Sequence, residues 1–253
     1  TVSDDDINPD HINPINQLHS KELAKQLYIE NLYDGFVRLA ERLCLACQLG
    51  DLNMVKRLAH RNVDIDCRNS ECYSPLDVAI RNGHLHIVVW LTDYGCEINT
   101  FVCGQSPPWT PLCLAIKENR MDMITCLIAH GASLHILGSD EDTACYPLHI
   151  ACECGNLEIV QLLIGVGADV NICRNDGNTS LHIACKSGNL DMTKLLLLAG
   201  ANINADNNHG STPLYLACLH EHHDIVKFLL QSGADINQDM EETPLYLTCK
   251  HNR

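Results

Sequence analysis

The sequence is poor in aromatic and basic residues. Aromatic residues make up only 5% of the chain, and 17 Lys and Arg face 32 Asp and Glu, which gives a formal net charge of −15. Affinity for phosphate backbones and for anionic membranes comes mainly from Lys and Arg, so this balance argues against nucleic-acid binding and against direct membrane insertion. It favours solubility and a protein partner with a basic or mixed-charge surface.

Signals of export, membrane insertion and catalysis are also missing. The chain opens without a signal-peptide pattern and contains no run of about 18 apolar residues that could cross a membrane. Its glycines do not follow the order of a phosphate-binding loop, and no serine lies in a nucleophile elbow. No nucleophile with a neighbouring base and no carboxylate cluster can be placed in one pocket. We therefore expect no enzyme, no catalytic residue and no cofactor.

What the sequence has instead is a repeat. Four segments, residues 110–115, 146–151, 179–184 and 212–217, read TPLCLA, YPLHIA, TSLHIA and TPLYLA. The leucine in the third position recurs through the chain at spacings of 33, 36, 36, 33, 33 and 31 residues. These leucines are Leu43, Leu76, Leu112, Leu148, Leu181, Leu214 and Leu245. Each copy predicts a helix, a short turn, a second helix and an extended finger.

A period near 33 residues with this opening resembles the ankyrin repeat family. The resemblance covers residues 41–253 and implies an all-α solenoid of helix pairs with projecting finger loops. We expect six repeats and a partial seventh, at about 41–73, 74–109, 110–145, 146–178, 179–211, 212–242 and 243–253. Residues 1–18 are polar and are predicted to be loose. Residues 19–40 are predicted to form a helix that caps the stack, because terminal repeats need a cover.

Particular residues have expected places in this pattern. Proline suits the first turn of a helix, where its missing N–H costs nothing, and this predicts the roles of Pro75, Pro111, Pro147, Pro213 and Pro244. In the family, the histidine of the opening ties one repeat to the next, which implies a structural role for His149 and His182. Where a glycine should end the first helix, Asn119 and Glu221 stand instead. A positive φ suits Asn better than Glu, so we expect local strain at Glu221.

Fifteen cysteines are spread along the chain. Five of them follow the alanine position of the repeat opening, namely Cys47, Cys152, Cys185, Cys218 and Cys249, and Ile80 and Ile116 share that register. A position that accepts Cys or Ile indicates apolar packing, so we expect reduced thiols and a cytoplasmic or nuclear protein. The Cys44–Cys47 pair, the Cys152–Cys154 pair and the HEHH segment at 220–223 could be read as metal ligands, but their spacing completes no site. We expect no metal.

The fingers are the expected partner-binding surface. Two of them, residues 97–109 and 133–145, are three residues longer than the others, and insertions in repeat proteins often mark the binding face. Side chains expected near finger tips are Arg68, Phe101, Trp109, Asp140, Glu141, Asp142, Arg174, Asp176 and His209. Two alternatives stay open: Phe101 and Trp109 pack within their own long finger, and the acidic run at 140–142 is only solvated charge.

The resemblance implies a non-catalytic scaffold or adaptor that binds a protein through its finger tips and concave groove. Alternatives are the substrate-recognition arm of a ubiquitin ligase and the regulatory segment of a larger enzyme or channel. Because the sequence stops within a repeat, we expect the native protein to continue beyond Arg253, and we expect the segment alone to be monomeric. Asn171, Asn204 and Asn237 match finger positions that are hydroxylated in some family members.

Overall fold

The computed structural model describes residues 39–61, 63–101, 109–136 and 146–236. These residues form twelve helices and contain no strand. In chain order the helices are α2 (Leu39–Leu49), α3 (Leu52–Ala59), α4 (Pro75–Asn82), α5 (Leu85–Tyr94), α6 (Pro111–Lys117), α7 (Met121–Ala129), α8 (Pro147–Glu153), α9 (Leu157–Gly165), α10 (Ser180–Lys186), α11 (Leu190–Leu198), α12 (Pro213–Leu219) and α13 (His223–Gln231).

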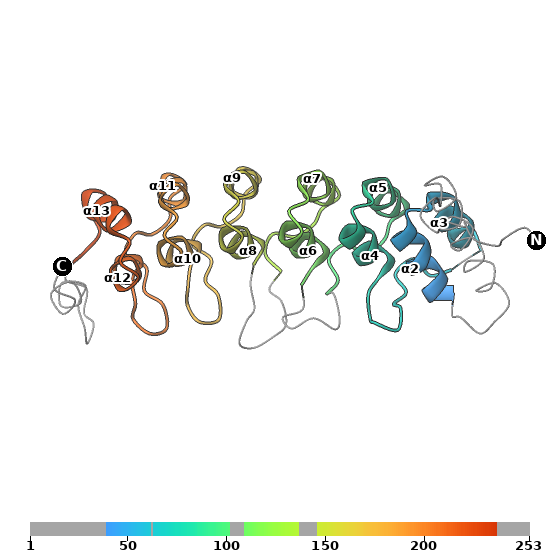
Figure 1. Ribbon diagram of the computed structural model, residues 1–253, viewed down its shortest axis with the longest axis horizontal. Helices are drawn as coiled ribbons and strands as arrows, with labels where there is room; N and C mark the ends of the chain where they lie inside the picture. The colour runs from blue at the N-terminus through green and yellow to red at the C-terminus, as the bar shows by residue number, and fades with distance from the viewer. Residues whose placement is uncertain (1–38, 62, 102–108, 137–145, 237–253) are drawn as a thin grey trace, which may run out of the picture.

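The helices stack as six antiparallel pairs along one long axis. The even-numbered helices lie in one row and the odd-numbered helices in a second row, and the finger loops project from the even-numbered side (Figure 1). We call the even-numbered row the inner helices and the odd-numbered row the outer helices. Each inner helix packs on the next, from α2 through α12. The predicted all-α solenoid is confirmed, whereas the expected N-terminal cap and partial seventh repeat lie outside the described residues.

Four of the six inner helices, α4, α6, α8 and α12, begin at a proline. The side chains of Ser74, Thr110 and Thr212 accept hydrogen bonds from backbone N–H groups in the first turn, which would otherwise lack a partner. Pro75, Pro111, Pro147 and Pro213 occupy the first helical position, and Pro244 lies outside the described residues. This start is local in origin, so it recurs with little change in α4, α6 and α12.

The turn inside each helix pair requires a left-handed backbone. Glycine takes this conformation in most copies, but Asn119 and Glu221 adopt it as well, with φ angles of 55° and 61°. The predicted replacement of glycine at these two turns is therefore confirmed. The left-handed region costs an L-residue about 1–2 kcal/mol. The turn at Glu221 is strained.

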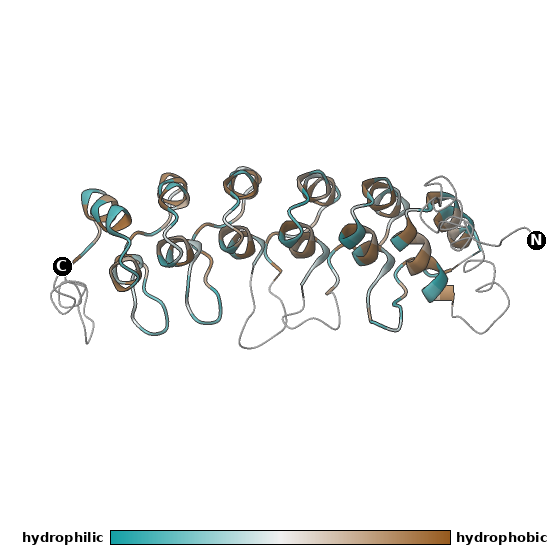
Figure 2. Ribbon diagram, in the orientation of Figure 1, coloured by the Kyte–Doolittle hydropathy of each residue, from teal (hydrophilic) through white to brown (hydrophobic). Residues whose placement is uncertain are grey.

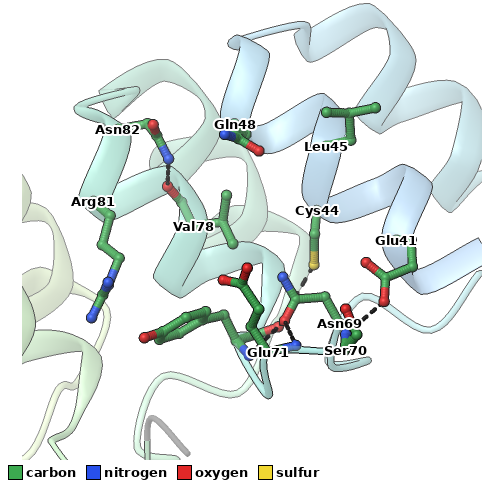
Figure 3. Close-up of a pocket in the computed structure, with 11 residues that line it drawn as sticks. Glu41, Cys44, Leu45, Gln48, Asn69, Ser70, Glu71, Val78, Arg81 and Asn82 are labelled. Atoms are coloured by element: carbon green, nitrogen blue, oxygen red, sulfur yellow. Dashed lines mark hydrogen bonds between the residues drawn. The ribbon is translucent and has the colours of Figure 1, made fainter. Parts of the chain in front are cut away.

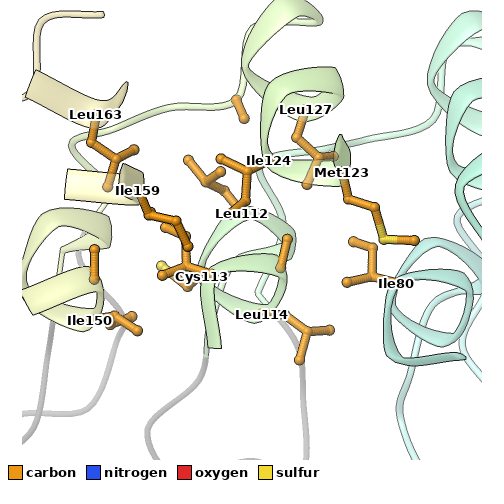
Figure 4. Packing of buried hydrophobic residues seen from close by; sticks show 14 of the residues in the cluster. Ile80, Leu112, Cys113, Leu114, Met123, Ile124, Leu127, Ile150, Ile159 and Leu163 are labelled. Atoms are coloured by element: carbon orange, nitrogen blue, oxygen red, sulfur yellow. The ribbon is translucent and has the colours of Figure 1, made fainter. Parts of the chain in front are cut away.

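The apolar core runs between the two rows and continues from pair to pair. Figure 4 shows Leu112 of α6 and Ile124 of α7 meeting Ile159 of α9, and all three side chains are fully buried. Apolar residues dominate the helices, whereas the fingers are more polar (Figure 2). Cys47, Cys152 and Cys185 lie in this core, as the repeat register predicted, and Cys218 is half-buried. These small thiols therefore pack in the core as apolar side chains.

Two sets of polar contacts lock neighbouring repeats together. In the fingers, the Asn171 Oδ1 atom accepts a hydrogen bond from the Asn202 N–H at 2.7 Å, and its Nδ2 donates to the Gly200 carbonyl at 3.1 Å. Asn99 makes the equivalent pair of bonds to the finger that follows it. These bonds satisfy backbone groups that no sheet or helix satisfies.

The second set lies at the turns. The His222 Nε2 atom is 3.1 Å from the Lys186 carbonyl oxygen, and its ring lies against Gly188 of the preceding turn. His84 lies in the same way against Gly50 and contacts the Gln48 carbonyl oxygen at 3.0 Å. Each turn is therefore shaped to receive a side chain from the next one.

Candidate partner-binding surface

The two histidines of the repeat opening are buried and point into the fold. His182 Nδ1 accepts from the Thr179 N–H at 3.1 Å, and Nε2 lies 2.9 Å from the Ser211 carbonyl oxygen in the next finger. His149 bridges the Tyr146 N–H and the Ile172 carbonyl in the same manner. Burial lowers the pKa of His149 to about 4 and also lowers the pKa of His182. Both rings are therefore neutral at physiological pH and are held by backbone groups.

Cys44 and Asp77 stand at the position of these histidines in other repeats. They show how the contact between inner helix and finger can be replaced. The Cys44 thiol donates to the Tyr73 carbonyl at 3.6 Å, which keeps the link between helix and finger with a weaker donor. Asp77 forms a capping box with Ser74, and burial raises the pKa of its carboxyl group. Its Oδ1 atom is buried without a hydrogen-bond partner among the described residues. None of these side chains is positioned for chemistry on an external ligand.

Several of the predicted finger-tip residues hold the fingers themselves. Arg68 donates from Nη1 to the Cys72 carbonyl at 2.9 Å and from Nη2 to the Phe101 carbonyl at 2.8 Å, so it joins two successive fingers. Arg174 forms an ion pair with Glu153. Asp176 accepts hydrogen bonds from the Asn178 backbone and side chain. Their role toward a partner stays a prediction.

The remaining predicted residues lie apart from these. His209 is exposed in the finger before α12. Phe101 is half-buried at the edge of the described finger. Trp109 is half-buried, packs on the apolar core and has Lys117 Nζ 5.8 Å from its ring centroid. Asp140, Glu141 and Asp142 lie outside the described residues. The structure therefore brings Trp109 toward the inner helices and places His209 elsewhere.

A hollow of about 450 Å³ opens between α2, α4 and the finger that joins their repeats. Arg81 lies at one end of this α2–α4 hollow and Glu41 at the other, with Glu71 between them (Figure 3). The Arg81 guanidinium carbon is 4.3 Å from the centroid of the Tyr73 ring. Glu41 accepts a hydrogen bond from the Ser70 N–H at 2.6 Å. The hollow thus carries both signs of charge.

A second hollow of about 380 Å³ lies farther along the same inner face, which we call the α8–α12 hollow. It is lined by the Arg174–Glu153 pair, by Lys186 of α10 and by His220 at the end of α12. Partial burial, with Lys186 and His222 nearby, lowers the pKa of His220. Both hollows lie between the inner helices and the fingers, and they mark the groove that the solenoid leaves open.

Arg81, Tyr73 and Lys117 were not predicted as binding residues. A signal was nevertheless present, because Tyr73 and Trp109 are 36 residues apart, as are Arg81 and Lys117. Comparing aligned copies position by position, rather than searching for catalytic motifs, would have found it.

The described residues hold no group of three or more His, Cys, Asp or Glu that could bind a metal ion. The contact with Cys44 lowers the pKa of Cys67, while the same contact and burial raise the pKa of Cys44. All cysteines in the described ranges are free thiols. No helix among the described residues is both long and apolar enough to span a membrane.

Comparison with known proteins agrees with this architecture. A family model for three copies of the ankyrin repeat matches residues 101–172 and 148–240, and a model for many copies matches residues 43–92. The structure is similar to the crystal structure of the ankyrin repeat domain of Bcl-3, described as a unique member of the IkappaB protein family. The TM-score is 0.71 at 28% identity, over 85% of this chain and 94% of that one. No curated sequence matches.

Ankyrin repeats generally serve protein–protein interaction and are typically non-catalytic. The chain belongs to the ankyrin repeat family.

Proposed function

We propose that the chain is a non-catalytic scaffold or adaptor that binds a partner protein along its finger tips and concave groove. The observation that carries the proposal is the pair of open hollows on the inner face, each lined by both helix and finger side chains. Interfaces that recognise proteins combine a partly apolar floor with polar groups at the rim. Val78 and Leu45 supply such a floor in the α2–α4 hollow, where Asn69 and Asn82 are polar.

The charge distribution supports a partner of mixed charge. Between residues 82 and 173, Lys117 and Arg120 face ten carboxylates, which gives a net charge of 2 − 10 = −8 for this stretch. In the described part of the stretch, Glu97, Glu118 and Glu158 are exposed. The acidic exterior favours basic surfaces by long-range attraction. The groove, by contrast, presents Arg81, Lys117 and Lys186.

The test blocks one face at a time with added bulk. Cys154→Trp with Ser187→Trp fills the groove at two exposed positions. Thr125→Trp with Ser232→Trp adds the same bulk at exposed positions of the outer face and serves as the matched control. Partners are captured on immobilised protein and quantified by mass spectrometry, after thermal unfolding has shown that both variants fold.

We expect the groove variant to lose partners that the wild type and the outer-face variant both retain. Equal recovery by all three proteins would contradict the proposal. Loss from the outer-face variant alone would move the binding surface to the odd-numbered helices.

A further inference from the structure

We propose that the concave groove binds a segment of the partner in the polyproline II conformation that carries two carboxylates about three residues apart, one held by Arg81 and one by Lys117. This inference rests on the proposed function and specifies the chemistry of the partner at that same groove. The residues involved occupy the same positions in two successive repeats, those of the second and third helix pairs. The cations in this register lie over aromatic rings, and we call the two sets the cation–ring pairs: Arg81 with Tyr73, and Lys117 with Trp109.

The two cation–ring pairs occupy equivalent places in their repeats. Arg81 Cζ lies 4.3 Å from the Tyr73 centroid, and Lys117 Nζ lies 5.8 Å from the Trp109 centroid. Both distances fall within the range of about 6 Å in which a ring attracts a cation. In each pair the ring precedes the cation by eight residues, and the pairs are 36 residues apart. The rings therefore hold two flexible cations at fixed intervals along the inner face.

Both cations are left available for an outside carboxylate. The ion pairs among the described residues involve His130, Arg174 and Lys194, and neither Arg81 nor Lys117 takes part in them. The Arg81 Nε atom is buried and has no hydrogen-bond partner in the described ranges. A guanidinium stacked on a ring keeps its edge free to bind a carboxylate through two N–H groups. Because Nε itself is buried, a partner carboxylate would bind through the terminal Nη groups of Arg81.

The remaining positions of this register make the row mainly cationic. Lys186 of α10 has the same register and lines the α8–α12 hollow. Between it and Lys117 stands Glu153, whose carboxylate is already paired with Arg174. In a chain with a net charge of −15, cations thus occupy three of the six inner-helix positions, and the single carboxylate in the row is neutralised. An acidic segment avoids the exterior and is attracted to this row.

Geometry sets the spacing of the expected carboxylates. Neighbouring packed helices lie about 8–10 Å apart, and Arg81 and Lys117 come from the neighbouring helices α4 and α6. A polyproline II segment advances about 3.1 Å per residue with three residues per turn, so side chains three residues apart lie on one side and about 9.3 Å apart, which covers that distance. A helical segment, at about 1.5 Å per residue, would need close to seven. The spacing of acidic residues in a bound segment therefore reports its conformation.

The acidic end of the α2–α4 hollow restricts the segment further. Glu41 lines the end of the hollow opposite Arg81, and Glu71 lies between the two (Figure 3). A third carboxylate placed there would be repelled, whereas Lys or Arg would be attracted. We therefore expect a basic residue on one side of the acidic pair and not a long acidic run.

The experiment selects peptides from a random 12-residue display library on the immobilised protein. Selections run in parallel on wild type, on an Arg81→Glu/Lys117→Glu variant and on an Arg57→Glu/Lys227→Glu variant. The last changes one Arg and one Lys at exposed outer-helix positions, so the two variants have the same net charge. Thermal unfolding shows whether each variant folds. Enriched peptides are synthesised with a dye and titrated by fluorescence anisotropy.

We expect peptides enriched on wild type and on the outer-helix variant to carry acidic residues three positions apart. On Arg81→Glu/Lys117→Glu the enriched residues at those positions should become Lys or Arg. Neutralising one cation, as in Arg81→Gln, should weaken a selected peptide about fivefold, as expected for a partly exposed ion pair at the upper end of its range. A Trp90→Phe background leaves Trp109 as the only indole, and its emission should change on binding.

Several results would overturn the inference. Peptides without an acidic pair, a spacing of seven, unchanged selection on the groove charge reversal, or no enrichment above the heat-unfolded protein would each do so. If peptides are lost on Cys154→Trp/Ser187→Trp but not on the charge reversal, the groove is the binding site and only this inference is wrong. If neither change affects them, the proposed function fails as well.

Discussion

Gly188 and Gly155 occupy equivalent turns, and replacing each by alanine should give unequal losses of stability. Both residues have a left-handed backbone, with φ angles of 76° and 70°. A Cβ atom at residue 188 would lie 2.6 Å from the His222 Cε1 atom, whereas a Cβ at residue 155 would have its nearest neighbour, Asn189 Nδ2, at 3.9 Å. Only the first substitution forces a neighbouring side chain to move.

The magnitudes follow from two contributions. The left-handed backbone costs an alanine about 1–2 kcal/mol, offset in part by the lower entropy of the unfolded chain. Gly155→Ala should therefore lower the free energy of unfolding by about 1 kcal/mol. Gly188→Ala adds the loss of the contact between His222 Nε2 and the Lys186 carbonyl, so the total should be about 2 kcal/mol.

The assay is urea unfolding followed by far-ultraviolet circular dichroism, with His222→Ala as the partner change. Once the imidazole is absent, Gly188→Ala should cost no more than Gly155→Ala does, because the clash is gone. Equal losses for the two glycines in the wild-type background would refute the idea that each turn is fitted to the next repeat's side chain. A Gly188→Ala penalty that persists in the His222→Ala background would refute it as well.

Three further outcomes can be measured with the same unfolding assay. Glu221→Gly should raise the free energy of unfolding by about 1 kcal/mol, because it relieves the left-handed backbone at φ 61°, and no gain would contradict the strain. Asn171→Ala should lower it by about 1–3 kcal/mol through the loss of two inter-finger hydrogen bonds, whereas a neutral result would show that water replaces them. Because burial lowers the pKa of His149 to about 4 while the unfolded ring titrates near 6.5, the unfolded state binds more protons between these values. Stability should therefore fall as pH drops from about 6.5 to 4, by roughly 3 kcal/mol, and His149→Gln should flatten this dependence if the ring causes it.

The repeating elements could be predicted from the sequence because their causes are local. A proline after a Ser or Thr cap fixes where α4, α6 and α12 begin, and the turn residues fix where they end. The apolar role of Cys152 followed from register alone, since Ile116 stands in the same place one repeat earlier. The left-handed backbone at Glu221 could also be predicted, because Glu stands where the other repeats have Gly or Asn.

The candidate surface was less predictable because it depends on contacts between repeats. Arg68 looked like a free finger-tip charge, yet its guanidinium joins two fingers through the Cys72 and Phe101 carbonyls. That bond spans 33 residues in sequence and no local pattern encodes it. Arg81 looked unremarkable because it lies within a helix. Its contact with Tyr73 places the residue just before α4 beside a side chain from the last turn of that helix.

Net charge is a poor guide to the partner of a solenoid, and the groove shows why. A charge of −15 predicts attraction to basic surfaces at a distance. At physiological ionic strength, however, salt screens interactions between charges that are farther apart than a Debye length of about 8 Å. Neighbouring inner helices are separated by about that distance. A segment in contact with Arg81 and Lys117 therefore responds mainly to these two side chains and their immediate neighbours. The same molecule can attract a basic surface to its exterior and hold an acidic segment in its groove.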